Sequence, residues 1–168
     1  MSKRAFGLWE PLPTRAMMSK PTRQELMTQL ALVRSRLAKR GIRQVSDYAE
    51  LLVAEALGGR RQENSQAAGY DLHAPTYGRV EVKSRRLPSD GRREERVSLD
   101  ESKKDGFDFL AVVIFFPDFH VKGAVLIPYA RVWPLASRHK YRRIDYKEVL
   151  AIEGALDITD AVAKVSQR

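Results

Sequence analysis

The sequence contains no cysteine, and this absence excludes two classes of small protein. A disulfide-stapled scaffold cannot form, and neither can a zinc site that uses thiolate ligands. Apolar residues make up 43% of the 168 residues, close to the usual share in globular proteins, so a hydrophobic core can form. The absence of cysteine fits a cytoplasmic protein, and that is the location we expect.

Long hydrophobic runs are also missing. The longest one, Phe109 to Phe116, is far shorter than the roughly 20 residues that a membrane-spanning helix needs. Residues 1–20 carry charges and have no apolar stretch typical of a signal peptide. We therefore expect a protein without a membrane segment, in which this run is a buried strand.

The net charge of +9 is unevenly distributed along the chain. Residues 1–45 hold ten lysines and arginines against two glutamates, whereas the remainder is nearly neutral. A basic front end on a balanced body favours a polyanionic partner, most simply nucleic acid. A generic solubilising tail is the alternative.

The order of predicted elements indicates an α/β protein. Thr22 and Glu25 form a capping-box pattern that begins one helix, and Asp47 to Leu57 predicts a second. The predicted strands are 70–74 and 79–84, which form a hairpin, followed after a polar crossover by 107–116 and 121–127. A crossover of this length permits parallel pairing, so we expect a mixed central sheet flanked by helices.

We divide the chain into three parts on this basis. Residues 1–20 are expected to form a mobile basic arm, and residues 21–135 the main domain. Residues 136–168 are expected to form a C-terminal helical extension, in which Thr159 is a plausible N-cap.

Three residues on the predicted hairpin carry the strongest chemical signal. Glu81 and Lys83 are two positions apart and therefore share one face of their strand. A hairpin of this length can bring Asp71 on the preceding strand beside Glu81. Two close carboxylates repel unless a cation lies between them, and a hard ion such as Mg²⁺ takes oxygen ligands. Such an ion polarises a phosphate oxygen and acidifies a bound water, while an ammonium group offsets phosphate charge.

Asp71 followed by Glu81-Val82-Lys83 resembles the PD-(D/E)xK nuclease superfamily, which includes restriction endonucleases, Holliday-junction resolvases and Mrr-like enzymes. The resemblance covers residues 47–127, and Tyr70 stands where the motif has its proline. It implies a restriction endonuclease-like core. It also implies that Asp71 and Glu81 bind Mg²⁺, with Mn²⁺ as a substitute, and that Lys83 assists the attacking water. Many members add an acidic residue on the first helix, and Glu50 is the best match for this further catalytic and metal-binding position.

Each of these readings has a simpler alternative. An acidic–apolar–Lys triplet on a strand is often only a solvent-facing ion pair. Glu50 could instead be a capping-box residue, with Asp47 as the N-cap. Glu55 is the fallback ligand, and its simpler role is on a solvated helix face.

Basic residues near the motif are candidates for contact with the phosphate backbone. A solvated loop, balanced by nearby acidic residues, is the alternative for those that follow the motif strand. The predicted nucleic-acid contacts are Arg85, Arg86, Arg92, Arg93, Lys39, Arg40 and Arg43.

The sequence therefore predicts a Mg²⁺-dependent endonuclease that hydrolyses phosphodiester bonds in DNA. Two alternatives stay open: a non-catalytic DNA-binding module on a nuclease scaffold, and a nuclease for RNA or branched DNA within a larger complex. The sequence carries no clear dimer signal, so a homodimer or a larger nucleoprotein complex also stays open.

Overall fold

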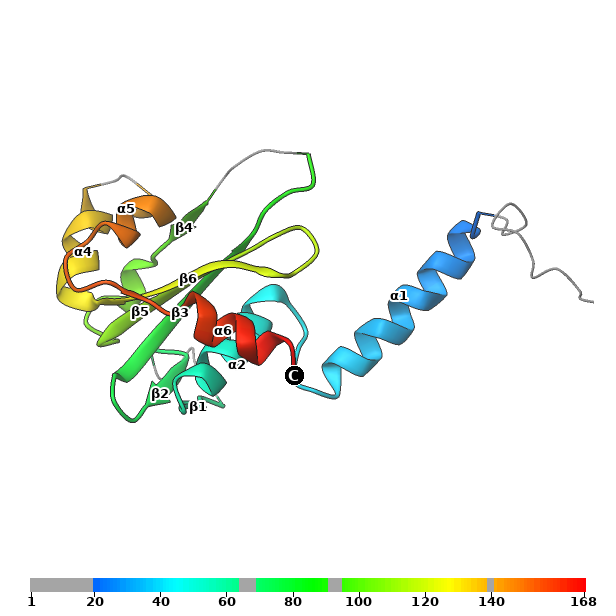
Figure 1. Ribbon diagram of the computed structural model, residues 1–168, viewed down its shortest axis with the longest axis horizontal. Coiled ribbons are helices and arrows are strands. Elements are labelled where there is room, and N and C mark those ends of the chain that lie inside the picture. Colours follow the sequence, from blue (N-terminus) through cyan, green and yellow to red (C-terminus); the bar gives the residue numbers. More distant parts are fainter. Residues whose placement is uncertain (1–19, 64–68, 91–94, 139–140) are drawn as a thin grey trace, which may run out of the picture. The chain divides into compact units, whose positions relative to one another are not determined.

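The computed structural model describes residues 20–63, 69–90, 95–138 and 141–168 (Figure 1). The chain divides into two compact units, Met1–Lys39 and Arg40–Arg168. The described part of the first unit contains helix α1 (Arg23–Ala38). The Thr22 hydroxyl accepts a hydrogen bond from the Glu25 backbone at 3.2 Å, and the Glu25 carboxylate accepts one from the Thr22 backbone at 2.6 Å. The predicted capping box is thus confirmed.

The second unit is built on a mixed six-stranded sheet in the order β1–β2–β3–β5–β6–β8. The strands β3 and β5 are parallel, and the other neighbouring pairs are antiparallel. The six strands are Arg60–Arg61 (β1), Leu72–Ala74 (β2), Gly78–Arg86 (β3), Phe109–Phe115 (β5), Val121–Pro128 (β6) and Leu156–Asp157 (β8).

Parallel pairing of β3 with β5 requires a long connection, because the chain must return to the same end of the sheet. The described part of this crossover contains the short strand β4 (Arg96–Ser98) and the 3₁₀ turn η2 (Glu101–Lys103). Strand β4 pairs with β7 (Arg143–Asp145) in a separate two-stranded sheet. The crossover is therefore held in place by a segment from much later in the chain.

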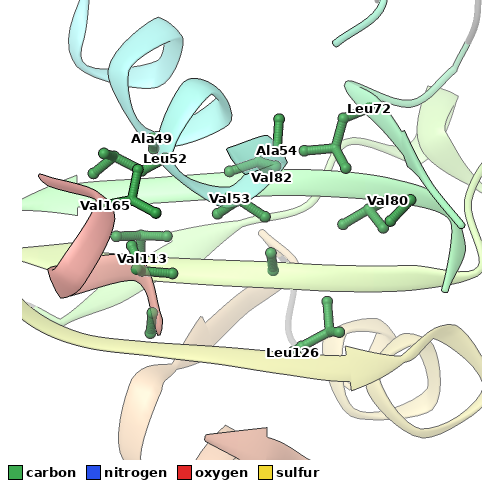
Figure 2. Close-up of a cluster of buried hydrophobic side chains, with 14 of the residues drawn as sticks. Ala49, Leu52, Val53, Ala54, Leu72, Val80, Val82, Val113, Leu126 and Val165 are labelled. Atoms are coloured by element: carbon green, nitrogen blue, oxygen red, sulfur yellow. The ribbon is translucent and has the colours of Figure 1, made fainter. Parts of the chain in front are cut away.

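One face of the central sheet is covered by α2 (Val45–Ala56) and α6 (Thr159–Ser166) (Figure 1). Figure 2 shows Leu52 and Val53 of α2 and Val80 and Val82 of β3 within one cluster of buried side chains. The alternation of side chains along each strand sends every second residue to this side. The apolar residues at helical spacing in α2 thus explain why it packs here.

The opposite face is covered by α4 (Tyr129–Ser137), α5 (Tyr146–Leu150) and the two-stranded sheet. The core on this face contains the residues of β5 and β6 that point away from α2, together with side chains from the covering elements. The fully buried members are Leu110, Val112, Ile114, Val125, Ile127, Val132, Ala136, Ile144 and Val149. Because both faces are covered, β5 reads as a continuous apolar run rather than an alternating one.

The expected α/β class, with a mixed sheet and flanking helices, is confirmed. The predicted hairpin, the crossover and the two strands after it are all present, and β3 runs two residues further than expected, to Arg86. Residues 136–168, expected as a helical extension, supply β7 and β8 as well as α5 and α6. Thr159, expected as the N-cap, is the first residue of α6, and Ile158 is the N-cap. The Thr159 hydroxyl accepts the Ala124 N–H at 2.9 Å instead of capping the helix.

None of the helices in the described parts of the chain combines the length and apolar character that crossing a membrane requires. The expected mobile arm lies outside the described residues, except for Lys20.

Adjacent phenylalanines at the end of β5 provide a matched test of this packing. Phe115 is fully buried and stacks on Tyr48 of α2 at 5.5 Å between ring centroids, whereas Phe116 is 43% exposed. We expect Phe115→Ala to lower the free energy of unfolding by about 3–5 kcal/mol, because it leaves a cavity. Phe116→Ala should have a much smaller effect. Urea unfolding followed by circular dichroism measures both, and equal losses would contradict this arrangement of the core.

Candidate functional site

The β2–β3 hairpin brings Asp71 and Glu81 together. In its register Leu72 lies opposite Val80, so the next step places Asp71 opposite Glu81. Glu81 and Lys83 are also aligned with Leu110 and Val112 of the parallel strand β5. Their side chains therefore share the sheet face covered by α4, α5 and the crossover.

Glu81 is fully buried and accepts hydrogen bonds from two lysines. Its Oε1 lies 2.5 Å from Nζ of Lys83, and its Oε2 lies 2.9 Å from Nζ of Lys103. Burial of a carboxylate is costly without such partners, because water no longer solvates the charge. The two ammonium groups stabilise the Glu81 carboxylate inside the protein.

Asp71 is also buried, with 6% of its surface exposed, and it uses its two oxygens differently. Oδ2 accepts the backbone N–H of Val82 at 2.8 Å, which fixes the orientation of the carboxyl group. Oδ1 faces the same ammonium as Glu81, at 3.9 Å from Lys103 Nζ. One oxygen of each acidic residue is thus directed at a common point, which Lys103 occupies.

The pKa of Asp71 is raised from 3.8 to about 6. Burial is the largest cause, and the negative charge of Glu81 is the next. The hydrogen bond from Val82 and the positive charge of Lys103 act in the opposite direction. The causes are the ones expected for two carboxyl groups that share a site with little water.

Lys103 is a site residue that the sequence analysis missed. It ends the η2 turn, whose N-cap Asp100 accepts the Ser102 N–H at 2.8 Å. The segment after this turn contacts the segment before Asp71, since a Cβ added to Gly106 would lie 2.8 Å from the Gly69 carbonyl oxygen. This close approach brings Lys103 to Asp71 across 32 residues of sequence, and no local pattern signals it.

Glu50 of α2 is bonded to a residue outside this group, Arg61. Its carboxylate accepts two hydrogen bonds from the Arg61 guanidinium, at 3.2 Å from Nε and 2.8 Å from Nη2. Burial raises the pKa of Glu50, and its charge in turn contributes to the raised pKa of Asp71. Metal binding by Glu50 stays a prediction.

The capping role considered for Glu50 is wrong. Helix α2 begins at Val45, two residues earlier than the expected start, so Asp47 is its third residue. The Asp47 carboxylate accepts the backbone N–H groups of Arg43 and Gln44, at 2.8 Å and 3.1 Å. Asp47 therefore caps the helix that Glu50 was considered to cap.

The predicted nucleic-acid contacts are spread over several elements. Arg85 and Arg86 belong to the end of β3, and the Arg86 guanidinium lies 4.9 Å from the centre of the Phe119 ring. Arg40 and Arg43 are exposed at the start of the second unit, and Lys39 is exposed in the first unit. The remaining two, Arg92 and Arg93, lie outside the described residues.

The donor set suits a hard divalent cation held with water. In the described part of the chain, no three side chains of Asp, Glu, His or Cys are grouped so that they could hold a metal ion. However, Asp71 Oδ1 and Glu81 Oε2 face one point, and both are hard oxygen donors. Magnesium sites commonly use one or two carboxylates and several waters. Asp71 and Glu81 therefore fit the ion that the motif predicts.

No protein-family model matches the chain, and no curated protein matches it either.

The raised pKa of Asp71 makes the stability of the protein depend on pH. The folded protein keeps the Asp71 proton up to about pH 6, whereas the unfolded chain loses it near pH 3.8. The contribution of Asp71 to the free energy of unfolding is therefore greatest at low pH and falls as the pH rises through this window. Asp71→Asn removes this charge and can keep the oxygen that accepts the Val82 N–H. As the pH rises from 4 to 7.5, we expect the free energy of unfolding of Asp71→Asn to increase relative to that of the wild type, by on the order of 2 kcal/mol.

Urea unfolding in EDTA across this pH range measures the gain. Asp118→Asn is the control, because the His120 backbone N–H lowers the pKa of this exposed carboxyl. Its replacement should therefore reduce stability at neutral pH, an effect of opposite sign. An Asp71→Asn protein that is less stable than the wild type at pH 7.5 would contradict the assigned environment.

Proposed function

We propose that this protein is a metal-dependent endonuclease that hydrolyses phosphodiester bonds in DNA. The observation that carries the proposal is the convergence of Asp71 Oδ1 and Glu81 Oε2 on one point, with Lys83 on the other oxygen of Glu81. A buried pair of carboxylates beside an ammonium is costly to maintain for stability alone. Arrangements of this kind are concentrated at functional sites.

The architecture is compatible with a restriction endonuclease-like core, which we propose as the fold family. Helix α2 is followed by an antiparallel hairpin, then by a crossover to a parallel strand, β5, and by an antiparallel strand, β6. The resemblance of residues 47–127 implies a helix, a three-strand meander, a second helix and another strand. Helix α2 and the strands β1, β2 and β3 match the first two parts, whereas the described residues of the crossover form β4 and the η2 turn instead of an α-helix. The motif residues lie at the β2–β3 pair, where the proposal requires them.

In the proposed mechanism, Asp71 and Glu81 bind the cation. A divalent ion bound there supplies positive charge for a phosphate oxygen and lowers the pKa of a water. The Val82 N–H keeps the Asp71 carboxyl oriented, so the reacting groups need little rearrangement. Lys83 extends from the motif strand with 26% of its side chain exposed, which lets its ammonium group approach a water or a phosphate. It would orient the attacking water and stabilise the charge that develops on the phosphate.

Basic residues around this centre would hold the DNA backbone. Arg85 and Arg86 follow Lys83 on β3 after one intervening residue, Ser84, so they continue along the motif strand from the proposed cleavage point. Guanidinium groups bind phosphate oxygens with charge-assisted hydrogen bonds. Such contacts fix the position of the duplex without reading its sequence.

Cleavage of supercoiled plasmid in Mg²⁺ tests the catalytic assignment. We expect Lys83→Ala and Asp71→Asn each to lower the rate by about 100-fold or more, because each removes a group that stabilises the transition state. Lys147→Ala, at an exposed lysine of α5, is the matched control and should cleave like the wild type. Circular dichroism of each variant verifies folding.

Equal cleavage by the wild type, Lys83→Ala and Asp71→Asn would rule out this site. The Asp71→Asn variant is especially informative, since it is expected to be more stable than the wild type at neutral pH. A loss of cleavage in that variant cannot be attributed to unfolding.

One observation favours a second function, a non-catalytic DNA-binding module. Both oxygens of Glu81 already have lysine partners, so the described protein balances this charge without a metal. Salt-dependent binding of a DNA duplex, with no cleavage in Mg²⁺ or Mn²⁺, would support this second function over the first.

Substitutions of two glutamates on α2 test whether Glu50 binds the metal ion or only contributes negative charge near the site. Glu50 contacts Arg61, whereas Glu55 is exposed on the same helix. We expect Glu50→Gln to lower the cleavage rate by about tenfold, because it alters the charge near the site without removing one of the two converging oxygens. Glu55→Gln should leave the rate unchanged. A loss as large as that of Asp71→Asn, measured at saturating Mn²⁺, would instead show that Glu50 is a metal ligand.

A further inference from the structure

Lys103 has no role in the proposed mechanism, yet its ammonium group lies at the centre of the site. Nζ is 2.9 Å from Glu81 Oε2 and 3.9 Å from Asp71 Oδ1. We propose that Lys103 is a built-in counter-ion that competes with the divalent cation for these two carboxylates and turns to a substrate phosphate when the cation binds. This inference rests on the proposed function and concerns the same site.

The competition follows from which atoms are involved. The two oxygens that face Lys103 are the same two that would bind the cation. Magnesium binds carboxylate oxygens at roughly 2.0–2.1 Å, so an ion shared by both oxygens would take up the space in front of them. An ammonium that stayed there would be in contact with a dication, and the repulsion between them would be strong. Lys103 and the cation therefore exclude each other.

The charges explain why the protein needs a lysine at this point. Lys83 contacts Oε1 of the fully buried Glu81, whereas Oε2 of Glu81 and Oδ1 of Asp71 both face Lys103. Without a cation near Oε2, the two acidic groups would repel each other in surroundings with little water. Lys103 supplies the missing positive charge while no metal is bound.

The side chain of Lys103 is able to leave. Its 17% exposure shows that it reaches the surface, and Ser102 and Lys104 beside it are exposed. Lysine carries its charge on a flexible four-carbon stem, and its ammonium group is strongly hydrated. The stem can redirect the charge outward without a change in the backbone of the η2 turn.

This arrangement links the binding of metal to the binding of substrate. A cation that arrives alone must displace Lys103 into water, whereas a phosphodiester in the site offers the displaced ammonium a new partner. Each ligand therefore raises the affinity for the other, and by the same factor. The free protein should bind a divalent cation weakly, and the complex with DNA should bind it more tightly.

Calorimetric titration of the full chain with Mn²⁺ tests the proposal. Lys103→Met removes the competing charge and keeps an apolar stem of similar length. We expect it to bind Mn²⁺ about tenfold more tightly than the wild type in the absence of DNA, because the ion no longer has to displace the Lys103 ammonium. Lys104→Met, at the exposed neighbour, is the matched control and should bind Mn²⁺ like the wild type. Equal or weaker binding by Lys103→Met would overturn the proposal.

A second titration includes a short DNA duplex. The duplex should raise the Mn²⁺ affinity of the wild type more than that of Lys103→Met, because only the wild type has an ammonium to transfer. Equal increases in the two proteins would contradict transfer of the ammonium to a phosphate.

Plasmid cleavage by the wild type separates this inference from the proposed function. Cleavage without a change in Mn²⁺ affinity in Lys103→Met would overturn the counter-ion and leave the nuclease standing. Tighter Mn²⁺ binding by Lys103→Met, without any cleavage by the wild type, would support the counter-ion and overturn the nuclease. Absence of both Mn²⁺ binding and cleavage would overturn both.

A second variant keeps the proposal testable if Lys103→Met does not fold. Lys103→Gln keeps a hydrogen-bond donor for Glu81 without the charge, and it should also bind Mn²⁺ more tightly than the wild type. Variants that fold only when Mn²⁺ is added would support the proposal, because the ion would then replace the ammonium. Failure of both variants to fold with or without Mn²⁺ would assign Lys103 a purely structural role and overturn it.

Discussion

The buried carboxylate of Glu81 constrains the elements that surround it. A carboxylate in the middle of a covered sheet is stable only if positive groups reach it from the surrounding elements. One of these groups, Lys83, comes from the same strand, and the other, Lys103, comes from the crossover. The sheet, the turn and the contact between Gly69 and Gly106 are all needed to keep the three side chains within hydrogen-bond distance.

The parallel pairing of β3 and β5 explains why a crossover is available for this purpose. An antiparallel connection between these strands could have been a tight turn, but a parallel one must pass over a face of the sheet. Here the connection passes over the face that carries Glu81 and is held there by pairing of β4 with β7. A single choice of strand direction thus covers the site and supplies its second lysine.

The sequence predicts the hairpin and its register well, because the period of the side chains and the turn around Gly78 are local features. From that register the proximity of Asp71 and Glu81 follows directly. The contribution of Lys103 could not be predicted, since it depends on the path of the crossover through space. The helix start at Val45 was missed for a different reason: Gln44 is a weak capping residue, and Asp47 reaches back from the third position instead.

The hydrogen bond between Asp71 and Val82 has a consequence for what can replace the aspartate. Strand β2 begins its pairing at Leu72, and just before it a side-chain oxygen, rather than a carbonyl, receives a β3 N–H. The length of the aspartate side chain is matched to that gap. A glutamate would keep the negative charge, yet its extra methylene would shift both oxygens away from the N–H and from the shared point. Geometry, and not charge alone, therefore restricts this position to a short acidic residue.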